Sequence, residues 1–170
     1  MIRTWVRCLI AYVICFLLQF LLNGALGRSV GAVDLTVALT LTAVLLFEDK
    51  VFWLIWGLLF LLAEDCLVGL VPGISVIPMA AVCGLLLLLQ HHLDLEDHPF
   101  LKVIVSAAGV FLFESAYWVL AHLAGNPYPY KGIFQGLPVE IVCTAVICFV
   151  TAVIVTKQQR RRKKKNWYIS

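Results

Sequence analysis

Six long apolar stretches follow one another along the chain, each bounded by charged residues or by Gly and Pro. They cover residues 8–26, 30–47, 51–71, 74–90, 101–124 and 133–156. Each is close to the ~20 mostly apolar residues that a helix needs to cross the hydrocarbon core of a bilayer. The pattern therefore predicts a single domain of about six transmembrane helices over residues 1–156. A short tail at 157–170 follows it.

The composition supports a membrane protein rather than a water-soluble one. The chain has 170 residues, of which 62% are hydrophobic and 14% are charged. Soluble domains are roughly 45–50% apolar and about 25% charged. The segments between the apolar stretches are short, so no soluble domain is expected. We predict an all-α integral membrane protein folded as a compact helical bundle.

The basic residues are distributed unevenly, and their distribution predicts the orientation. With both termini inside, the inner segments hold Arg3, Arg7, Lys50 and Lys102 together with seven Lys and Arg of the tail, eleven in all. The outer segments hold Arg28 and Lys131. Because cytoplasmic loops carry the excess of Lys and Arg, we expect a multi-pass membrane protein with both termini in the cytoplasm.

The tail is the most basic segment of the chain. Its consecutive basic side chains are Arg160, Arg161, Arg162, Lys163, Lys164 and Lys165. Each can attract anionic lipid with about 1 kcal/mol near the membrane surface. A nucleic-acid site would need aromatic side chains interleaved with the charges, so we expect lipid contact and no nucleic acid.

Motifs that would indicate catalysis or a bound metal are weak or missing. The sequence contains no Gly-x-Ser-x-Gly elbow, no HExxH and no P-loop, so no enzyme is expected. The loop from His91 to His98 combines three His with three carboxylates, which are ligands suited to zinc or manganese. A polar loop whose Asp97 caps the helix beginning at Pro99 is the simpler interpretation. We expect no metal and no cofactor.

Acidic residues inside apolar stretches are the informative polar positions. Ionisable groups in membrane helices are costly and usually functional. Asp34 is interpreted as a helix cap, and Glu140, after Pro138, as a residue of a first helical turn. Counting ~1.5 Å per residue along each helix places Asp65, Glu114 and Glu140 at similar depth in the outer half of the bilayer.

We therefore predict that Asp65 and Glu114, with Glu140, face a shared polar cavity. Glu64 is about 100° around the helix from its neighbour Asp65, so the two carboxylates cannot both point straight inward. Asp65 is the one expected to do so.

Several of these segments together resemble the rod shape-determining MreD family. Residues 57–69 are similar to its Gly-rich helix, in which an acidic residue, here Asp65, is followed by Gly69 at plus four. The segment 70–78, with Pro72, Gly73 and Pro78 as turn or packing residues, resembles the connector before its fourth helix. Residues 34–35 and 137–144 resemble the starts of its second and last helices. The likeness covers about residues 30–155 and does not include the basic tail.

This resemblance implies a function and a set of partners. It implies a non-enzymatic membrane subunit of the bacterial cell-elongation machinery, which makes peptidoglycan and sets rod shape. Members associate with the single-span protein MreC, and through it with cell-wall synthases and MreB filaments. The implied fold is related to the substrate-binding subunits of energy-coupling-factor transporters. A vitamin or metal-ion capture subunit of such a transporter is therefore the alternative function.

The two functions differ in what they require of the first helix. Capture subunits dock their transporter partner through small residues on that helix, and close helix approach needs a small-xxx-small face. Here the first stretch offers only Ala11 and Cys15 at i and i+4, among bulky Ile, Leu and Phe. This favours the scaffold.

Overall fold

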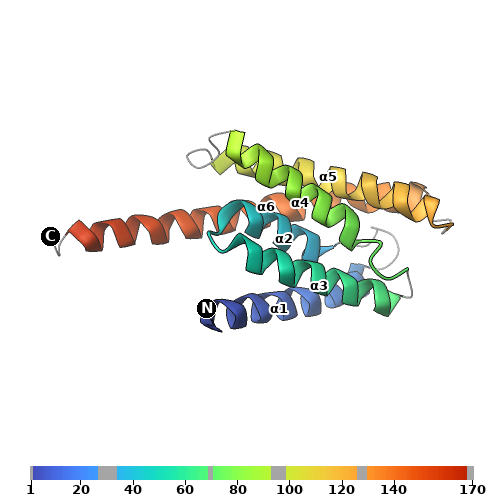
Figure 1. The fold of residues 1–170 in the computed structure, drawn as a ribbon, viewed down its shortest axis with the longest axis horizontal. Coiled ribbons are helices and arrows are strands. Elements are labelled where there is room, and N and C mark those ends of the chain that lie inside the picture. The colour runs from blue at the N-terminus through green and yellow to red at the C-terminus, as the bar shows by residue number, and fades with distance from the viewer. Residues whose placement is uncertain (1, 27–33, 69–70, 93–98, 126–129, 168–170) are drawn as a thin grey trace.

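A computed structural model describes residues 2–26, 34–68, 71–92, 99–125 and 130–167. Side chains are described within 4–24, 34–67, 71–90, 100–125 and 137–155. The regular structure in these ranges is helical. The helices are α1 (Ile2–Leu26), α2 (Leu35–Leu46), α3 (Lys50–Val68), α4 (Val76–His92), α5 (Pro99–Leu123) and α6 (Tyr130–Trp167). Figure 1 shows them side by side in one bundle, with α1 beginning and α6 leaving the bundle at the same end.

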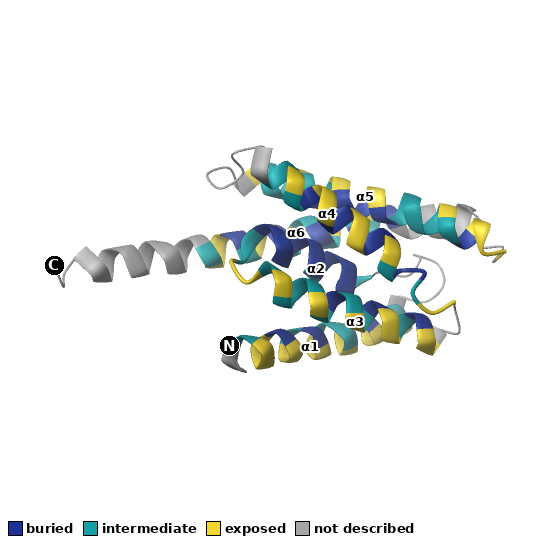
Figure 2. Ribbon diagram, in the orientation of Figure 1, coloured by how far each residue is buried: buried dark blue, intermediate teal, exposed yellow. Residues whose placement is uncertain are grey.

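The shortest helix, α2, lies at the centre of the bundle. It has twelve residues and packs against each of the other five helices. Its side chains Val37, Leu41 and Val44 are fully buried, and the core continues into Leu61 and Met79 of the neighbouring helices. Figure 2 shows α2 as almost wholly buried, whereas the outward side of α1 is exposed. The fold is therefore organised around α2.

Three of the helices are long and apolar enough to cross a membrane. Their apolar segments are Thr4–Gly24, Phe100–Leu123 and Leu137–Val155. The apolar parts of α2 and α4, Leu35–Leu46 and Val76–Gln90, are shorter. The nineteen residues of α3 include Lys50, Glu64 and Asp65. The all-helical fold is thus confirmed for the described residues, and three of its helices are long and apolar enough to span a membrane, while six full crossings stay a prediction.

The helix boundaries differ from the expected ones in two instructive places. The second helix was expected over 30–47, but α2 begins at Leu35 because Asp34 caps it. The sixth was expected to end at 156, before a separate tail. Instead α6 continues through the basic run to Trp167, which is consistent with the high helix propensity of Lys, Arg and Gln. The other four helices differ from the expected spans by up to six residues at either end.

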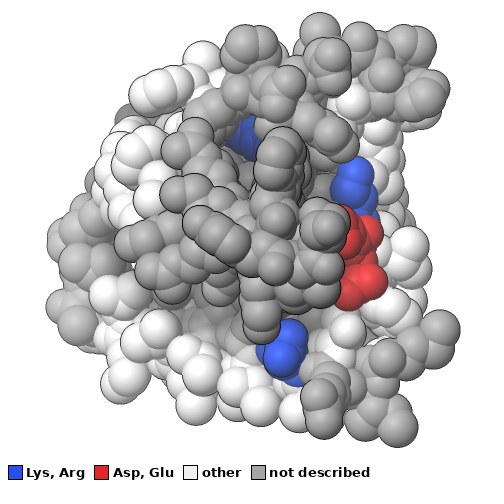
Figure 3. All heavy atoms as spheres, turned by 90° about the vertical axis from the view of Figure 1, so that its left-hand side faces the viewer, with Lys and Arg blue, Asp and Glu red and all other residues white. Residues whose placement is uncertain are grey.

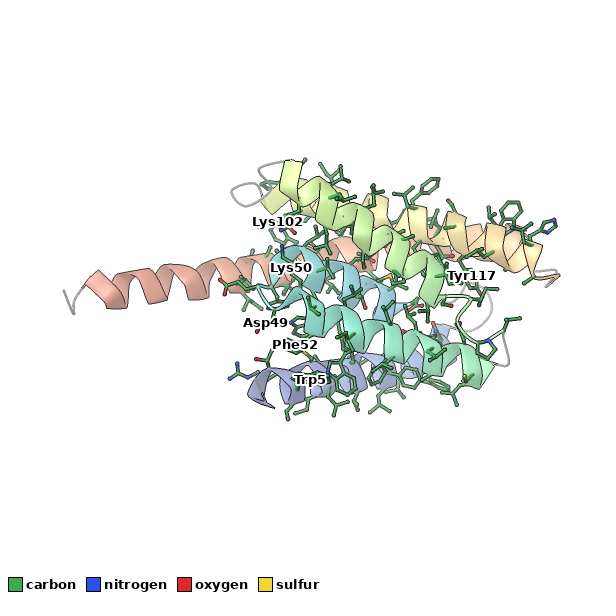
Figure 4. All side chains as sticks on the ribbon, in the orientation of Figure 1. Trp5, Asp49, Lys50, Phe52, Lys102 and Tyr117 are labelled. Atoms are coloured by element: carbon green, nitrogen blue, oxygen red, sulfur yellow. The ribbon has the colours of Figure 1, made fainter. Side chains whose placement is uncertain are left out.

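The two ends of the bundle carry different polar groups. Asp49, Lys50 and Lys102 lie at the end from which α6 projects, opposite Tyr117 (Figure 4). Seen from that end, Lys, Arg, Asp and Glu side chains reach the surface around the projecting helix (Figure 3). There the Lys50 ammonium donates to Gln90 Oε1 at 2.7 Å, and Gln90 donates to the Leu45 carbonyl at 3.3 Å. These bonds join the ends of α2, α3 and α4.

Candidate functional site: a buried polar network

Buried and half-buried polar side chains lie together toward the end of the bundle opposite the exposed Glu48 and Asp49. This end holds the start of α2, the end of α3 and the start of α4, and the site also draws on α1, α5 and α6. The acidic members of the site are Asp34, Glu64, Asp65, Glu114 and Glu140. Five carboxyl groups in an apolar bundle are expensive unless each has hydrogen-bond donors or carries a proton. Their partners therefore define what the site can do.

Asp34 is the N-cap of the central helix, as the sequence predicts. Its backbone is extended, with φ −96° and ψ 92°, and its Oδ1 accepts from the Val37 backbone N–H at 3.0 Å. This satisfies one of the unpaired N–H groups at the start of α2. Because α2 is central, its cap lies within electrostatic range of Glu64, Asp65, Glu114 and Glu140. Asp34 thus lies near the other acids, a proximity that its sequence position did not reveal.

Gln19 of α1 connects three helices. Its side chain is buried, and its Oε1 accepts from the Thr36 backbone N–H at 3.1 Å and from Thr36 Oγ1 at 3.2 Å. Its Nε2 donates to Glu64 Oε1. One amide thereby joins α1 to α2 and α3. Sequence reasoning missed Gln19, although its amide in the apolar run 8–22 was the available signal.

Asp65 holds the connection between α3 and α4. It is 1% exposed. Its Oδ2 accepts from the backbone N–H groups of Gly73 at 3.0 Å and Ser75 at 3.1 Å, and its Oδ1 accepts from Ser75 Oγ. Gly73 has φ +89°, a conformation that glycine adopts without steric cost. The turn expected at Pro72 and Gly73 is therefore present, and Asp65 stabilises it.

Glu114 of α5 and Glu140 of α6 meet between their helices. The two carboxyl groups are in hydrogen-bond contact. Glu140 is 2% exposed, and its Oε1 has no hydrogen-bond partner among the described residues. The interpretation of Glu140 as a first-turn residue was wrong. Helix α6 starts at Tyr130 and includes Pro138 in its interior, so the free N–H groups of its first turn lie elsewhere.

The structure thus brings together some of the predicted site residues and separates others. Glu114 and Glu140 are in contact. The oxygens of Asp65 instead bind the α3–α4 connector, and Glu64 turns toward α1. Asp65 is the inward-facing member of its pair, as its 1% exposure indicates. A cavity shared by Asp65, Glu114 and Glu140 stays a prediction.

A second polar junction, also missed from the sequence, lies deeper in the bundle. Tyr12 is fully buried, and its hydroxyl lies 2.9 Å from Thr40 Oγ1 and donates to the Trp53 carbonyl at 2.9 Å. Gly57 of α3 faces the same point. A Cβ added there would lie 2.6 Å from Thr40 Cγ2 and 2.9 Å from the Tyr12 hydroxyl. Gly57 therefore permits the close approach of α1, α2 and α3.

Other predicted positions lie outside the described residues or have an ordinary role. Of the loop expected from His91 to His98, the first two residues are instead the last of α4, and residues 93–98 lie outside the described part, as does Gly69. The side chains from Arg160 to Lys165 are also outside it. Pro78 is buried in the first turn of α4, where proline is tolerated. Within the part of the chain whose side chains are placed, no group of three or more His, Cys, Asp or Glu is arranged to hold a metal ion.

These polar groups attach the helices of the bundle to one another. Gln19, Asp34, Thr36 and Asp65 each use their polar atoms on backbone or side chains of the same bundle. Comparison of the chain with protein-family models, with curated proteins and with solved structures finds no match.

Proposed function

We propose that this chain is a non-enzymatic scaffold subunit in the membrane, acting in the bacterial cell-elongation machinery. The proposal rests on the resemblance of residues 30–155 to the MreD family and on the use that the chain makes of its buried polar groups. A scaffold needs a fixed arrangement of helices to present to its partners. Polar contacts between helices supply such an arrangement in lipid, where apolar side chains are attracted to one another no more than to the lipid.

The observation that carries the proposal is the environment of Asp65. This residue leads the acid-to-glycine pattern that carries the resemblance, and it is the acid most expected at a ligand site. Three hydrogen bonds from Gly73 and Ser75 occupy its carboxylate. An acid used in this way fixes the α3–α4 connector and has little capacity left for a captured ligand. This favours the scaffold over the capture subunit of a vitamin or metal-ion transporter.

The proposed topology is six crossings with both termini in the cytoplasm. It is supported by the start of α1 and the departure of α6 at one end of the bundle (Figure 1) and by the eleven inner against two outer basic residues. The buried acids then lie in the outer half. The helical continuation of α6 carries the basic residues of the tail into the cytoplasm, where they contact anionic lipid.

The proposed partner is a single-span membrane protein of the MreC type. Through it the chain would be linked to cell-wall synthases outside and MreB filaments inside. No small substrate is turned over in this proposal, and membrane lipids are the other molecules in contact with the chain.

Variants of Asp65 test the proposal in cells depleted of the native protein. Asp65→Asn keeps the contacts, because the Asn oxygen can accept from both backbone N–H groups while its amide donates to Ser75 Oγ. Asp65→Leu leaves two buried N–H groups unpaired, at about 1–3 kcal/mol each. We expect depleted cells to round or swell, Asp65→Asn to restore rod shape, and Asp65→Leu to restore it poorly.

The matched control is Glu48→Gln, which removes an exposed acid at the other end and should restore shape fully. Normal shape after depletion, together with lost uptake of a vitamin or metal ion, would contradict the scaffold and favour the capture subunit. Equal failure of Asp65→Asn and Asp65→Leu would contradict the structural role of Asp65.

A further inference from the structure

Two threonine hydroxyls inside the bundle differ from the other buried Ser and Thr hydroxyls of the described residues. Thr42 of α2 and Thr144 of α6 are both 0% exposed, yet neither hydroxyl oxygen has a hydrogen-bond partner in the described part. The other buried Ser and Thr hydroxyls are all bonded, namely those of Thr36, Thr40, Ser75 and Ser106. The two unpartnered hydroxyls therefore need an explanation of their own.

The usual local acceptor does not satisfy these two hydroxyls. A threonine hydroxyl in a helix can donate to a carbonyl one turn earlier in its own helix. Thr40 does so to the Thr36 carbonyl at 2.7 Å, and Ser115 does so to the Phe111 carbonyl at 2.7 Å. The hydroxyls of Thr42 and Thr144 make no such bond. They are thus available to a partner between the helices.

The two threonines lie along one seam, where α2 packs against α6. Glu140, Thr144 and Cys148 are buried and four residues apart, which places them on one side of α6. Cys148 lies beside Thr42 of α2 and Ser106 of α5, although its sulfur does not reach hydrogen-bond geometry with the Thr42 hydroxyl. Thr144 is one helical turn from Cys148, so the two unpartnered hydroxyls are neighbours along this α2–α6 seam.

The α2 residue opposite Thr144 cannot supply a hydrogen bond. Helices α2 and α6 run in the same direction (Figure 1). Since Thr42 lies beside Cys148, the preceding turn of each helix brings Ala38 opposite Thr144. Ala38 is 0% exposed, and its methyl group neither donates nor accepts. The side chain across the seam is therefore small and apolar at the one level where a hydroxyl needs a partner.

A third buried oxygen on the same seam is also unpartnered. Glu140 is 2% exposed, and its Oε1 has no hydrogen-bond partner among the described residues. Glu140 and Thr144 are separated by one turn, about 6 Å along the helix axis at ~1.5 Å per residue. One water with two hydrogen bonds of about 2.8 Å spans nearly that distance. Buried waters typically occur where polar groups would otherwise be unsatisfied.

We propose that the α2–α6 seam binds ordered water inside the bundle. One water bridges Glu140 Oε1 and Thr144 Oγ1, and a second binds Thr42 Oγ1 beside the Cys148 thiol. Each position offers two polar atoms of the chain, as a buried water needs. The site is independent of the scaffold function and would serve a transporter subunit equally. Failure of the scaffold experiment therefore leaves it standing, and the reverse also holds.

Radiolytic hydroxyl-radical labelling of the full chain in lipid nanodiscs, measured by mass spectrometry, tests the proposal. Radicals formed from a bound water attack the side chains next to it, and thiols oxidise readily. Cys148 and Cys83 are both 0% exposed, but Cys83 lies in the apolar core and is the matched control. We expect several-fold faster labelling of Cys148 than of Cys83. The double variant Thr42→Val/Thr144→Val should reduce the labelling of Cys148 to that of Cys83.

Two labelling results would overturn the proposal. Equal labelling of Cys148 and Cys83 in the wild type means that the seam is dry, and this comparison needs no variant. Unchanged labelling of Cys148 in a folded double variant means that the hydroxyls hold no water.

Thermal unfolding of Thr144→Val gives a second measurement, because the substitution removes the hydroxyl and nearly keeps the shape. Loss of a water-mediated bond should lower the unfolding midpoint. A dry, unpaired hydroxyl is itself unfavourable, so its removal should leave the midpoint unchanged or raise it. That second result would contradict the bound water. Thr40→Val, which removes a hydroxyl bonded within the chain, shows the size of the decrease to expect.

Discussion

Helices α1 and α2 are both strongly apolar, but they occupy opposite environments. Ten of the twelve residues of α2 are buried, whereas α1 has eleven large hydrophobic side chains among the exposed ones. Their polar residues show the same division. The hydroxyls of Thr36, Thr40 and Thr42 in α2 all lie inside the bundle. In α2 these polar side chains thus mark the buried side of the helix.

The inward face of α1 follows the same rule. Cys8, Tyr12, Cys15 and Gln19 are spaced four, three and four residues apart, which places them on one side of a helix. Tyr12, Cys15 and Gln19 each hydrogen-bond to another helix, with Cys15 Sγ donating to the Leu35 carbonyl at 3.2 Å. The exposed side consists of Leu, Ile, Val and Phe, apart from Trp5, Arg7 and Gly24. Hydrogen bonds to other helices on one face and an apolar surface on the other therefore account for how residue types are distributed around α1.

The largest effect is expected from Gln19→Leu. The substitution leaves the Thr36 backbone N–H and the Glu64 carboxyl without their partner inside the bundle. Unsatisfied buried groups cost about 1–3 kcal/mol each, so we expect a loss of roughly 2–4 kcal/mol in the free energy of unfolding. Thermal unfolding in detergent measures it. Leu17→Ala on the exposed face of α1 is the control, and an equal loss there would break the distinction between the two faces.

Two helical glycines sharpen the comparison with a somewhat smaller effect. In Gly57→Ala the new methyl group meets Thr40 and the Tyr12 hydroxyl where α1, α2 and α3 are closest. Overpacking of this kind costs about 1–3 kcal/mol. Gly84 of α4 has nothing within 4 Å of an added Cβ, so Gly84→Ala should gain about 0.5–1 kcal/mol from helix propensity. Unfolding midpoints that move in the same direction would show that α1–α3 are not in close contact at Gly57.

The smallest effect is expected from Tyr12→Phe, which keeps the ring and removes the hydroxyl. The ring still stacks on Phe60, with centroids 5.5 Å apart. Loss of the bonds to Thr40 and the Trp53 carbonyl should cost about 1 kcal/mol. A double-mutant cycle with Thr40→Val isolates the hydroxyl pair, and a coupling energy near zero would show that the two helices are not joined at this point.

The sequence predicts the membrane class, the number of helices and local features such as the Asp34 cap and the Pro72–Gly73 turn. These depend on apolar length and on neighbouring residues alone. The central position of α2, the contacts of Gln19 and Tyr12, and the requirement for Gly57 depend on which helices become neighbours. The Asp65 contacts are intermediate in how far the sequence predicts them. Ser75 is ten residues from Asp65 along the chain, but only the turn between α3 and α4 separates the two residues. Sequence spacing predicted an inward-facing acid and not its partner.

The most direct test of the scaffold account is recovery of the tagged full-length chain from its native membrane in a mild detergent, followed by mass spectrometry. The account predicts a stable complex with a single-span coiled-coil protein together with cell-wall synthases. The complex should weaken in Gln19→Leu and persist in Leu17→Ala. Recovery of a pair of transporter ATPases in place of these proteins would contradict the scaffold and identify a capture subunit.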